Sequence, residues 1–289
     1  MGPGDFNFLQ EMLKRESGLV LTEEKSYLLE SRLIPVARKL SLNGIEELVV
    51  RAKNGTSPEV KKAIIEAMTT NESFFFRDIK PFDIFREATL PYYLDARQNT
   101  RKIKIWCAAA SSGQEPYSLA MILNELGPKI AGWNVDILGT DISTDILDKA
   151  INGLYTQFEV QRGLPVQNLV KYFDKEDEHW RVKSELRSMV KYREFNLLDS
   201  FATLGQFDIV FCRNVLIYFD QETKAQILAR IAECMPPDGL LFLGGAETVL
   251  GISNLFQPIP KLRGVYEVAS KESGPSAFME HPAVAAFAS

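Results

Sequence analysis

Histidine and cysteine are both scarce in this chain of 289 residues. It holds two histidines, His179 and His281, and three cysteines, Cys107, Cys212 and Cys234, at unrelated spacings. Zinc sites and Ser–His or Cys–His hydrolases need several such residues together, so the sequence supports neither class, and we expect no metal. The cysteines are expected to be small buried hydrophobic residues.

A long apolar run, a leader pattern and a strong net charge are missing as well. No stretch approaches the ~18 consecutive apolar residues of a membrane span, and the N-terminus lacks the basic-then-apolar pattern of a signal peptide. We therefore expect a cytoplasmic protein without direct membrane insertion. The net charge of −5 gives no global attraction to nucleic acid, and 46% hydrophobic residues are ordinary for a globular protein.

A glycine-rich dinucleotide turn is absent, although the frame around such a turn is present. An apolar strand over residues 103–107 leads into the turn Ala-Ala-Ala-Ser-Ser-Gly (108–113), and an amphipathic helix begins near Glu115. A carboxylate at the start of this helix would repel a pyrophosphate and attract a cation. S-adenosylmethionine (SAM) carries a sulfonium and an ammonium and no phosphate, so the pattern favours SAM as cofactor.

Two periodicities divide the chain. Residues 1–80 repeat apolar side chains at helical spacing, which predicts a small all-α domain. Residues 81–270 alternate strand and helix patterns, which predicts an α/β domain with a mainly parallel, Rossmann-like sheet. Residues 271–289 are mostly Ser, Gly, Pro and Ala with little to bury, and we expect a disordered tail.

A third pattern interrupts this alternation at about residues 170–195. Segments 179–186 and 189–195 alternate with period two and have no helix pattern between them. We expect both to be strands of a small antiparallel subdomain inserted into the sheet domain.

Polar residues follow several expected strands, where ligands bind in α/β sheets. Asp141 can accept hydrogen bonds from ribose hydroxyls; the alternative is a helix N-cap, for which Ser143 is better placed. Asn196 is suited to an adenine edge or to a turn. Asn214 follows the strand near residue 210, and Tyr218 is either catalytic or a core aromatic with a satisfied hydroxyl.

The segment 69–78 joins the two expected domains and contains three consecutive phenylalanines. Phenylalanines alone would indicate core, but Asn71, Ser73 and Arg77 cluster around them. We expect a lid over a pocket at the domain boundary, with a surface ion pair as the alternative for Arg77.

Together these segments resemble the CheR-type chemotaxis receptor methyltransferases. The resemblance covers about residues 5–270, and its motifs are residues 69–77, 106–118, 139–141, 195–197, 211–219 and 237–239. It implies a SAM-dependent protein-glutamate O-methyltransferase that esterifies glutamates on the cytoplasmic helical bundle of chemoreceptors and releases S-adenosylhomocysteine. It also implies an N-terminal helical domain, a methyltransferase domain with a β-subdomain, a monomer, and recruitment to membrane-bound receptor arrays. A regulatory protein partner stays open.

The resemblance also implies roles for single residues. Arg77 and Tyr218 would lie nearest the transferred methyl group, and Ser73 stands where threonine is also found. The cofactor contacts would be Asn71, Ser73, Arg77, Ala108, Glu115, Asp141, Asn196, Leu197, Arg213 and Asn214.

Substrate helices should be acidic, so a basic helical face is expected in the first domain. Arg32, Arg38 and Lys39 lie on its second helix, with Arg32 and Lys39 on one face; a merely solvated face is the alternative. Family members that dock on a receptor pentapeptide have a glycine-containing loop in the β-subdomain. Residues 172–180 are glycine-free and acidic, which argues against such a tether.

Glutamate has a reference pKa of about 4.3, so this nucleophile is ionised at neutral pH and needs no general base. That property fits the shortage of histidine. Two other functions stay open: a methyltransferase with a non-receptor acceptor such as a small molecule or RNA, and a non-catalytic SAM-sensing interaction protein.

Overall fold

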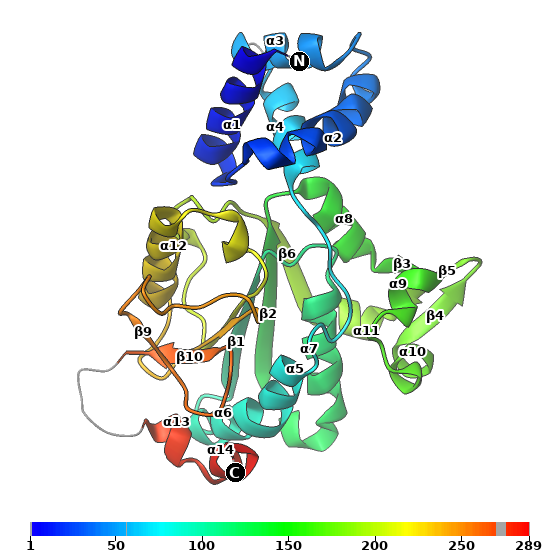
Figure 1. The fold of residues 1–289 in the computed structure, drawn as a ribbon. Helices are drawn as coiled ribbons and strands as arrows, with labels where there is room; N and C mark the ends of the chain where they lie inside the picture. The colour runs from blue at the N-terminus through cyan, green and yellow to red at the C-terminus, as the bar shows by residue number, and fades with distance from the viewer. Residues whose placement is uncertain (1, 56, 270–275, 289) are drawn as a thin grey trace.

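The structure, a computed structural model, describes residues 2–55, 57–269 and 276–288, and it has two lobes (Figure 1). The smaller lobe has its own apolar core, to which Leu9, Leu33, Leu48 and Ile64 contribute fully buried side chains. Its helices are α1 (Pro3–Ser17), η1 (Glu23–Lys25), α2 (Ser26–Lys39), α3 (Ile45–Lys53) and α4 (Pro58–Met68). The all-α prediction for this part of the chain is confirmed.

The larger lobe is built on a sheet that has seven strands among the described residues, in the order β6-β2-β1-β7-β8-β10-β9. The first five run parallel, and β10 runs antiparallel to both of its neighbours, β8 and β9. Their bounds are β1 (Lys102–Ala108), β2 (Asn134–Asp141), β6 (Val190–Glu194), β7 (Ile209–Cys212), β8 (Leu240–Leu243), β9 (Phe256–Pro258) and β10 (Val265–Val268). The chain passes from β1 outward to β6 and returns to β7, so the strand order reverses between β1 and β7. Ligand sites lie at such reversals.

Helices cover both faces of the sheet because side chains alternate along each strand. Ile105 and Phe211 point into one apolar cluster, whereas Trp106 and Val210 point into the other. The first face is covered by α5 (Lys80–Ile84), the π-helical turn η2 (Phe85–Thr89), α6 (Leu90–Ala96) and α7 (Gln114–Glu125). The second is covered by η4 (Phe201–Thr203) and α12 (Gln221–Glu233). Shorter connecting helices are η3 (Gly127–Ile130) and α8 (Thr144–Asn152).

The insert exists, but its predicted extent is wrong. Its antiparallel sheet has the order β3-β5-β4, and segment 189–195 is not part of it. Instead β6 pairs in parallel with β2 at the edge of the main sheet. An edge strand of a parallel sheet exposes one face, so its sequence alternates like an antiparallel strand. The elements of the insert are β3 (Leu154–Thr156), α9 (Gln157–Gln161), α10 (Val166–Tyr172), β4 (Phe173–Glu176), β5 (His179–Val182) and α11 (Ser184–Arg187).

The prediction of a disordered tail is wrong for residues 276–288. They form α13 (Ala277–Glu280) and α14 (Pro282–Ala288), which bury Phe278 and Val284. The ring of Phe278 meets that of Tyr92 edge-on, 5.2 Å between centroids, so a few apolar side chains suffice to hold this segment on α6. The other residues of the predicted tail, 271–275 and 289, lie outside the described residues.

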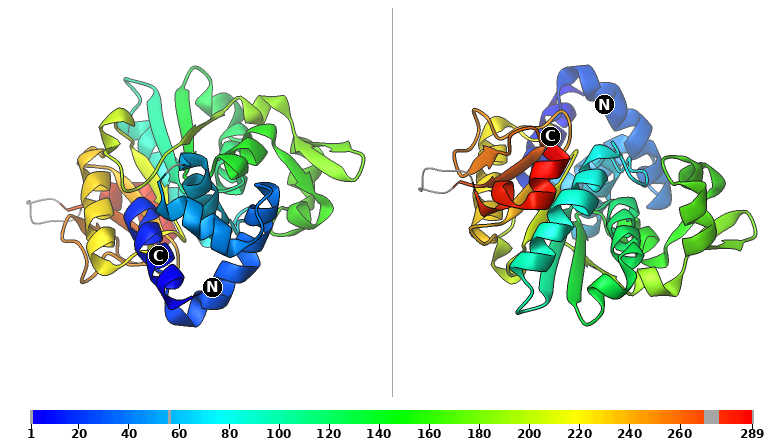
Figure 2. Two further views of the ribbon diagram at one scale, coloured as in Figure 1. Left: turned by 90° about the horizontal axis from the view of Figure 1, so that it is seen from above. Right: turned by 90° about the horizontal axis from the view of Figure 1, so that it is seen from below.

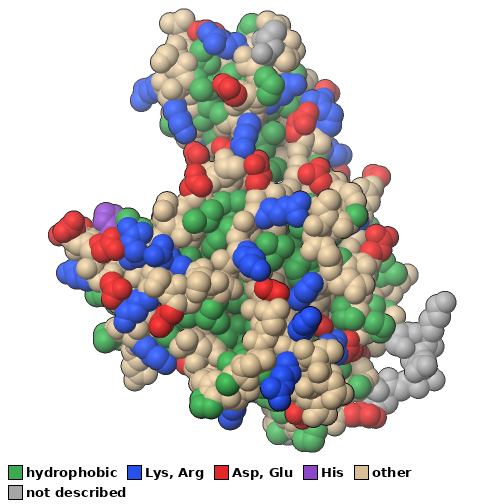
Figure 3. Space-filling model, turned by 180° about the vertical axis from the view of Figure 1, so that it is seen from behind, with side chains coloured by type: hydrophobic (Ala, Val, Ile, Leu, Met, Phe, Trp, Pro, Cys, Tyr) green, Lys and Arg blue, Asp and Glu red, His purple; other side chains and the backbone are tan. Residues whose placement is uncertain are grey.

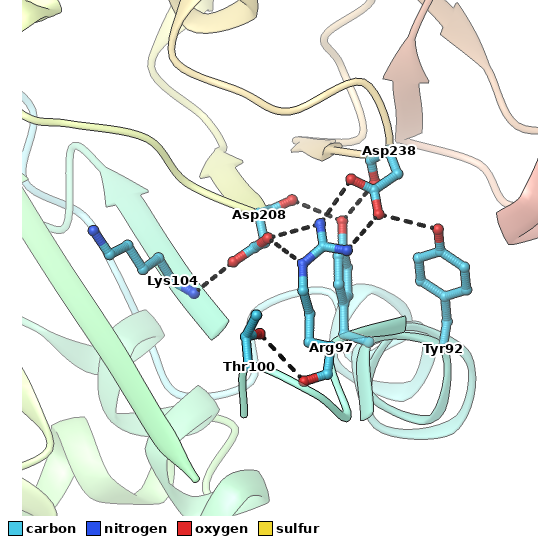
Figure 4. A network of polar contacts seen from close by, with 7 residues as sticks. Tyr92, Arg97, Thr100, Lys104, Asp208 and Asp238 are labelled. Carbon is cyan, nitrogen blue, oxygen red and sulfur yellow. Dashed lines mark hydrogen bonds and ion pairs between the residues drawn. The ribbon is translucent and has the colours of Figure 1, made fainter. Parts of the chain in front are cut away.

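A polar network fastens α6 to the sheet at the end opposite the strand carboxyl termini (Figure 4). Arg97 donates to Asp208 Oδ1 at 3.0 Å and makes two hydrogen bonds to Asp238, at 2.8 and 2.7 Å. The Tyr93 hydroxyl bonds the backbone carbonyl groups of both aspartates, at 2.8 and 2.7 Å. Asp208 directly precedes β7 and Asp238 lies two residues before β8, so the network fixes where both strands begin.

Two views along the long axis show how the parts are arranged (Figure 2). The insert projects from one side of the larger lobe, and α12 lies on the other side. Within the described residues, no helix is both long enough and apolar enough to cross a bilayer.

Candidate functional site

A pocket lies where residues 69–79, the linker between the lobes, pass over the carboxyl ends of β1, β2 and β7. Residues of the helical lobe, the linker and the sheet domain all contribute to it, although they are far apart in the chain. Its lining consists of Ser17, Leu19, Thr69, Thr70, Asn71, Glu72, Ser73, Arg77, Ala109, Ala110, Ser111, Glu115, Asp141, Ile142, Phe195, Asn196, Leu197, Arg213, Asn214, Val215, Tyr218 and Phe219.

This pocket brings together all the predicted cofactor and catalytic residues except Ala108. Ala108 is the last residue of β1 and is buried in the sheet, and the pocket is lined by the two alanines that follow it. The predicted turn thus borders the pocket, from Ala109 onward.

The turn after β1 has to be small partly for a reason that the sequence did not reveal. Gly113 has φ +90°, and an added Cβ would lie 2.6 Å from the hydroxyl of Tyr192. Ala109 and Ser111 also adopt left-handed backbone conformations, at φ 58° and 51°. Packing on the edge strand β6 thus demands glycine at the end of the turn, while its first residues face the pocket.

Asp141 is held rigidly at the end of β2. Its Oδ2 accepts from the Ser111 amide at 2.9 Å and its Oδ1 from the Ser143 amide at 3.0 Å. The carboxyl is buried, and burial raises its pKa despite these donors. Ser143 is the N-cap of α8, accepting from the Ile146 amide, so the N-cap alternative for Asp141 does not apply. The Ile142 amide also donates to this carboxylate, which has about four acceptor sites in all and so keeps one for a ligand hydroxyl.

Glu115 and Arg213 form a buried ion pair beneath the linker. Arg213 Nη1 donates to Glu115 Oε2 at 2.7 Å, and Nη2 donates to the Arg77 carbonyl at 2.8 Å and to Asp78 Oδ2 at 2.7 Å. Burial raises the pKa of Glu115, and the attraction of Arg213 opposes that rise. Arg213 is only 5% exposed, so its main contacts are with the protein. It braces the linker against the start of α7.

Arg77 and Tyr218 reach the pocket from different elements. Arg77 donates to the Glu72 carbonyl at 2.9 Å and lies over the ring of Phe74, 5.4 Å from its centroid. Tyr218 ends the turn η5 (Leu216–Tyr218), and its backbone carbonyl accepts from Val20 at 3.0 Å. Its hydroxyl has no hydrogen-bond partner within the described residues, so it is available to a ligand.

The helical lobe closes the pocket from above, and sequence reasoning missed this contribution. Ser17 and Leu19 line the pocket, and the Asn196 side chain donates to the Glu16 carbonyl at 2.6 Å. Gly18, which lies between Ser17 and Leu19 in the chain, has φ +75°, and an added Cβ would lie 2.9 Å from the ring of Phe219. The only local signal is a glycine just after a helix, which marks a helix end and not a pocket.

Two of the residues predicted to dock the substrate contact other parts of the protein. Arg32 donates to the carbonyl groups of Met68 and Thr69 at 2.8 and 3.0 Å, and Lys39 makes a surface ion pair with Asp145 at 3.2 Å. Their shared face of α2 therefore points at the linker and α8, but Lys39, like Arg38, is exposed. On the face that Figure 3 shows, basic and acidic side chains are mixed over the helical lobe and the narrowing below it.

The donor set of the pocket suits a cationic nucleoside. Two buried carboxylates, Glu115 and Asp141, stand beside the turn, and Asn196, Leu197 and Val215 offer amide and apolar surface. Among the residues that the structure describes, no group of three or more His, Cys, Asp or Glu is placed to hold a metal ion.

Comparison with protein families and known proteins agrees with this geometry. Residues 71–265 match a family model described as CheR methyltransferase, SAM binding domain, and residues 4–69 match CheR methyltransferase, all-alpha domain. The chain is 39% identical over 266 residues to chemotaxis protein methyltransferase Cher2 of Pseudomonas putida, covering 90% of this chain and 96% of that protein. It is 41% identical over 267 residues to chemotaxis protein methyltransferase 1 of Pseudomonas aeruginosa, with the same coverage.

Likeness to solved structures is weaker. PKMT2 from Rickettsia typhi aligns with a TM-score of 0.36 and 17% sequence identity, over 60% of this chain and 26% of that one.

Proposed function

Since this chain belongs to the CheR methyltransferase family, a family of SAM-dependent chemotaxis methyltransferases, we propose that it methylates glutamate side chains of chemoreceptors. The observation that carries the proposal is the makeup of the pocket. Arg77 and Tyr218 line it, and the two histidines of the chain do not. A carboxylate acceptor suits this pocket, because it is ionised at neutral pH and needs a cation to orient it but no base.

When bound, SAM supplies an electrophilic methyl group. In our proposal Asp141 accepts a hydrogen bond from a ribose hydroxyl, and Glu115 faces the ammonium group. Asn196 and Leu197 border the adenine, as suits an amide and an apolar side chain at the end of β6. These assignments agree with the burial of both carboxylates beside the turn.

The chain's own residues contribute mainly alignment and exclusion of water. Arg77 is placed to orient the acceptor carboxylate, and the free hydroxyl of Tyr218 supports the reacting geometry. Methyl transfer to a carboxylate merges opposite charges, so orientation matters more than charge stabilisation. Holding two reactants in line can supply roughly 7–11 kcal/mol of the barrier reduction.

Receptor docking remains a proposal for the exposed side of the helical lobe. The acceptor is the cytoplasmic helical bundle of receptors in membrane-bound arrays, reached by a monomeric enzyme in the cytoplasm. Arg38 and Lys39 are exposed and can meet an acidic helix, whereas Arg32 is partly buried and already donates to the linker.

Transfer of radiolabelled methyl from SAM to receptor cytoplasmic fragments tests the proposal. Methanol released by base, and lost when the receptor glutamates are changed to alanine, is the expected result. Tight binding of SAM without transfer to any receptor would instead support another acceptor or a sensing role. Failure to bind SAM would contradict both.

Replacing Arg77 tests its assigned role. Arg77→Ala should lower kcat by roughly a hundredfold, because the acceptor loses its orienting cation, and should change the Kd for SAM little. Steady-state methylation and calorimetric SAM titration measure the two quantities. Arg51→Ala is the control, since Arg51 pairs with Glu47 on the surface of the helical lobe. An Arg77→Ala enzyme that turns over like wild type would remove Arg77 from the mechanism.

A further inference from the structure

Glu247 is a buried carboxylate that does not line the pocket but accepts hydrogen bonds from four backbone amides beside it. Its Oε2 accepts from Asn214 and from Gly244, both at 2.7 Å. Its Oε1 accepts from Val215 at 2.9 Å and from Leu216 at 2.7 Å. The side chain is 9% exposed, so water offers these amides little replacement.

These amides need such an acceptor because of the backbone path after β7. Asn214 has φ 60°, a left-handed conformation that Asn tolerates better than most residues. The chain turns there, so the amides of residues 214–216 leave the sheet ladder and converge on one point. Converging amides form an anion-binding concavity, and here the anion is the carboxylate of Glu247. Bonds to a charged acceptor are stronger than neutral ones.

The turn that Glu247 holds carries part of the pocket. Asn214 and Val215 line it, and the same turn continues to Tyr218. Glu247 and the turn are tightly packed against Gly244, because a Cβ added at Gly244 would lie 2.7 Å from Glu247 Oε2 and 2.8 Å from Asn214 Nδ2. We therefore expect a change at Glu247 to move Asn214 and Val215, which line the pocket.

We propose that Glu247 is a positioning residue, which holds Asn214, Val215 and Tyr218 in place for cofactor binding and methyl transfer. It does so by joining the end of β8 to the turn after β7, and it touches neither reactant. The part that concerns methyl transfer rests on the proposed function, whereas the part that concerns SAM binding does not.

Glu247→Gln tests the proposal with little change in size. The amide keeps one acceptor oxygen and turns an NH₂ group toward backbone donors. We expect the Kd for SAM to rise about tenfold, since hydrogen bonds are lost and donors are left unpaired. We expect kcat to fall by roughly tenfold to a hundredfold through misplacement of Tyr218. Amide hydrogen exchange at residues 214–216 should speed up, which reports on the turn without any catalysis.

Glu267→Gln is the matched control. Glu267 is 7% exposed, lies in β10 and accepts one hydrogen bond from Gln257 at 2.7 Å, away from the turn. It should leave SAM affinity, kcat and exchange at residues 214–216 unchanged. Glu247→Asp keeps the charge on a shorter side chain and should recover part of both losses.

A folded Glu247→Gln protein with wild-type SAM affinity, kcat and amide hydrogen exchange would overturn the proposal. A variant with a lower Tm but wild-type SAM affinity and kcat would overturn it as well. If this variant does not fold, Gly244→Ala presses on the same carboxylate and must then weaken SAM binding; wild-type affinity in that variant would overturn the proposal. If the wild-type enzyme methylates no receptor, the proposed function fails, and SAM affinity and exchange still decide the role of Glu247.

Discussion

At the scale of single residues, close backbone contacts decide how the two lobes meet over the pocket. Gly18 is the clearest case, because it adopts φ +75° and an added Cβ would lie 2.9 Å from the ring of Phe219 and 3.2 Å from the side chain of Leu198. Any side chain here combines an unfavourable backbone conformation with a collision. Its neighbours Ser17 and Leu19 line the pocket, so a backbone shift at Gly18 should change the shape of the pocket.

Gly18→Ala should therefore destabilise the protein by about 2 kcal/mol, through left-handed backbone strain and overpacking together. It should also weaken SAM binding severalfold. Thermal unfolding and SAM titration measure the two effects. Gly205→Ala is the control, because Gly205 has φ +85° but nothing within 4 Å of an added Cβ. Equal behaviour of the two variants would show that the contact with Phe219 is unimportant.

At the scale of secondary-structure elements, different kinds of polar contact stabilise the two ends of the sheet. At the carboxyl ends of the strands, Glu247 and Asp141 bind backbone amides of the turns. At the other end, Arg97 joins α6 to the two aspartates that precede β7 and β8 (Figure 4). The first set shapes the pocket, and the second only sets where the strands begin.

Arg97→Ala should lower the stability by about 2 kcal/mol, since it leaves two half-buried carboxylates without their cation. That change corresponds to a fall in Tm of roughly 5 °C, with the Kd for SAM unchanged. Burial raises the pKa of Asp238, but hydrogen bonds from Arg97 outweigh this and the pKa is lowered overall. The contribution is therefore full above the ordinary carboxyl pKa of about 4 and is lost as the pH falls below it.

Unfolding followed as a function of pH checks this prediction. The stability of the Arg97→Ala variant should approach that of wild type below about pH 4. A variant with wild-type Tm at neutral pH, or one with weakened SAM binding, would contradict the division between the two ends of the sheet.

At the scale of the whole molecule, the insert is joined to the pocket through the linker. Phe75 is fully buried and meets the ring of Tyr155 in the insert edge-on, 5.1 Å between centroids. Arg162, also in the insert, pairs with Glu72 at 2.6 Å and lies 4.4 Å from the Phe74 centroid, over the ring that Arg77 also contacts. A disturbance of the insert thus reaches Arg77 through two side chains.

Arg162→Ala should lower kcat about three- to tenfold, because Arg77 loses the support of its linker. SAM affinity and Tm should change little, since Arg162 is partly exposed and its ion pair is worth little to stability. Arg181→Ala is the control: Arg181 is an insert arginine that pairs with Glu176, away from the linker. If the two variants have the same kcat, the insert is not coupled to Arg77 by this route.

The sequence by itself determined the two lobes and most of the strands. All the cofactor and catalytic residues predicted from it, except Ala108, line the pocket. These features depend on local periodicity and on motifs that place Asp141 or Asn214 at or near the end of a strand, and such patterns can be recognised without knowledge of distant contacts. The family assignment likewise followed from motifs that are short and ordered along the chain, with the extent of the family match adding support.

Only the tertiary structure decided which strand β6 joins, that α13 and α14 are ordered, and what Glu247, Gly18 and Arg162 do. Each of these depends on a partner far away in the chain. Glu247 carries no local pattern, because its partners are backbone amides of another turn, and backbone amides look the same in every sequence. Contacts of this kind arise only when the folded chain brings its segments together.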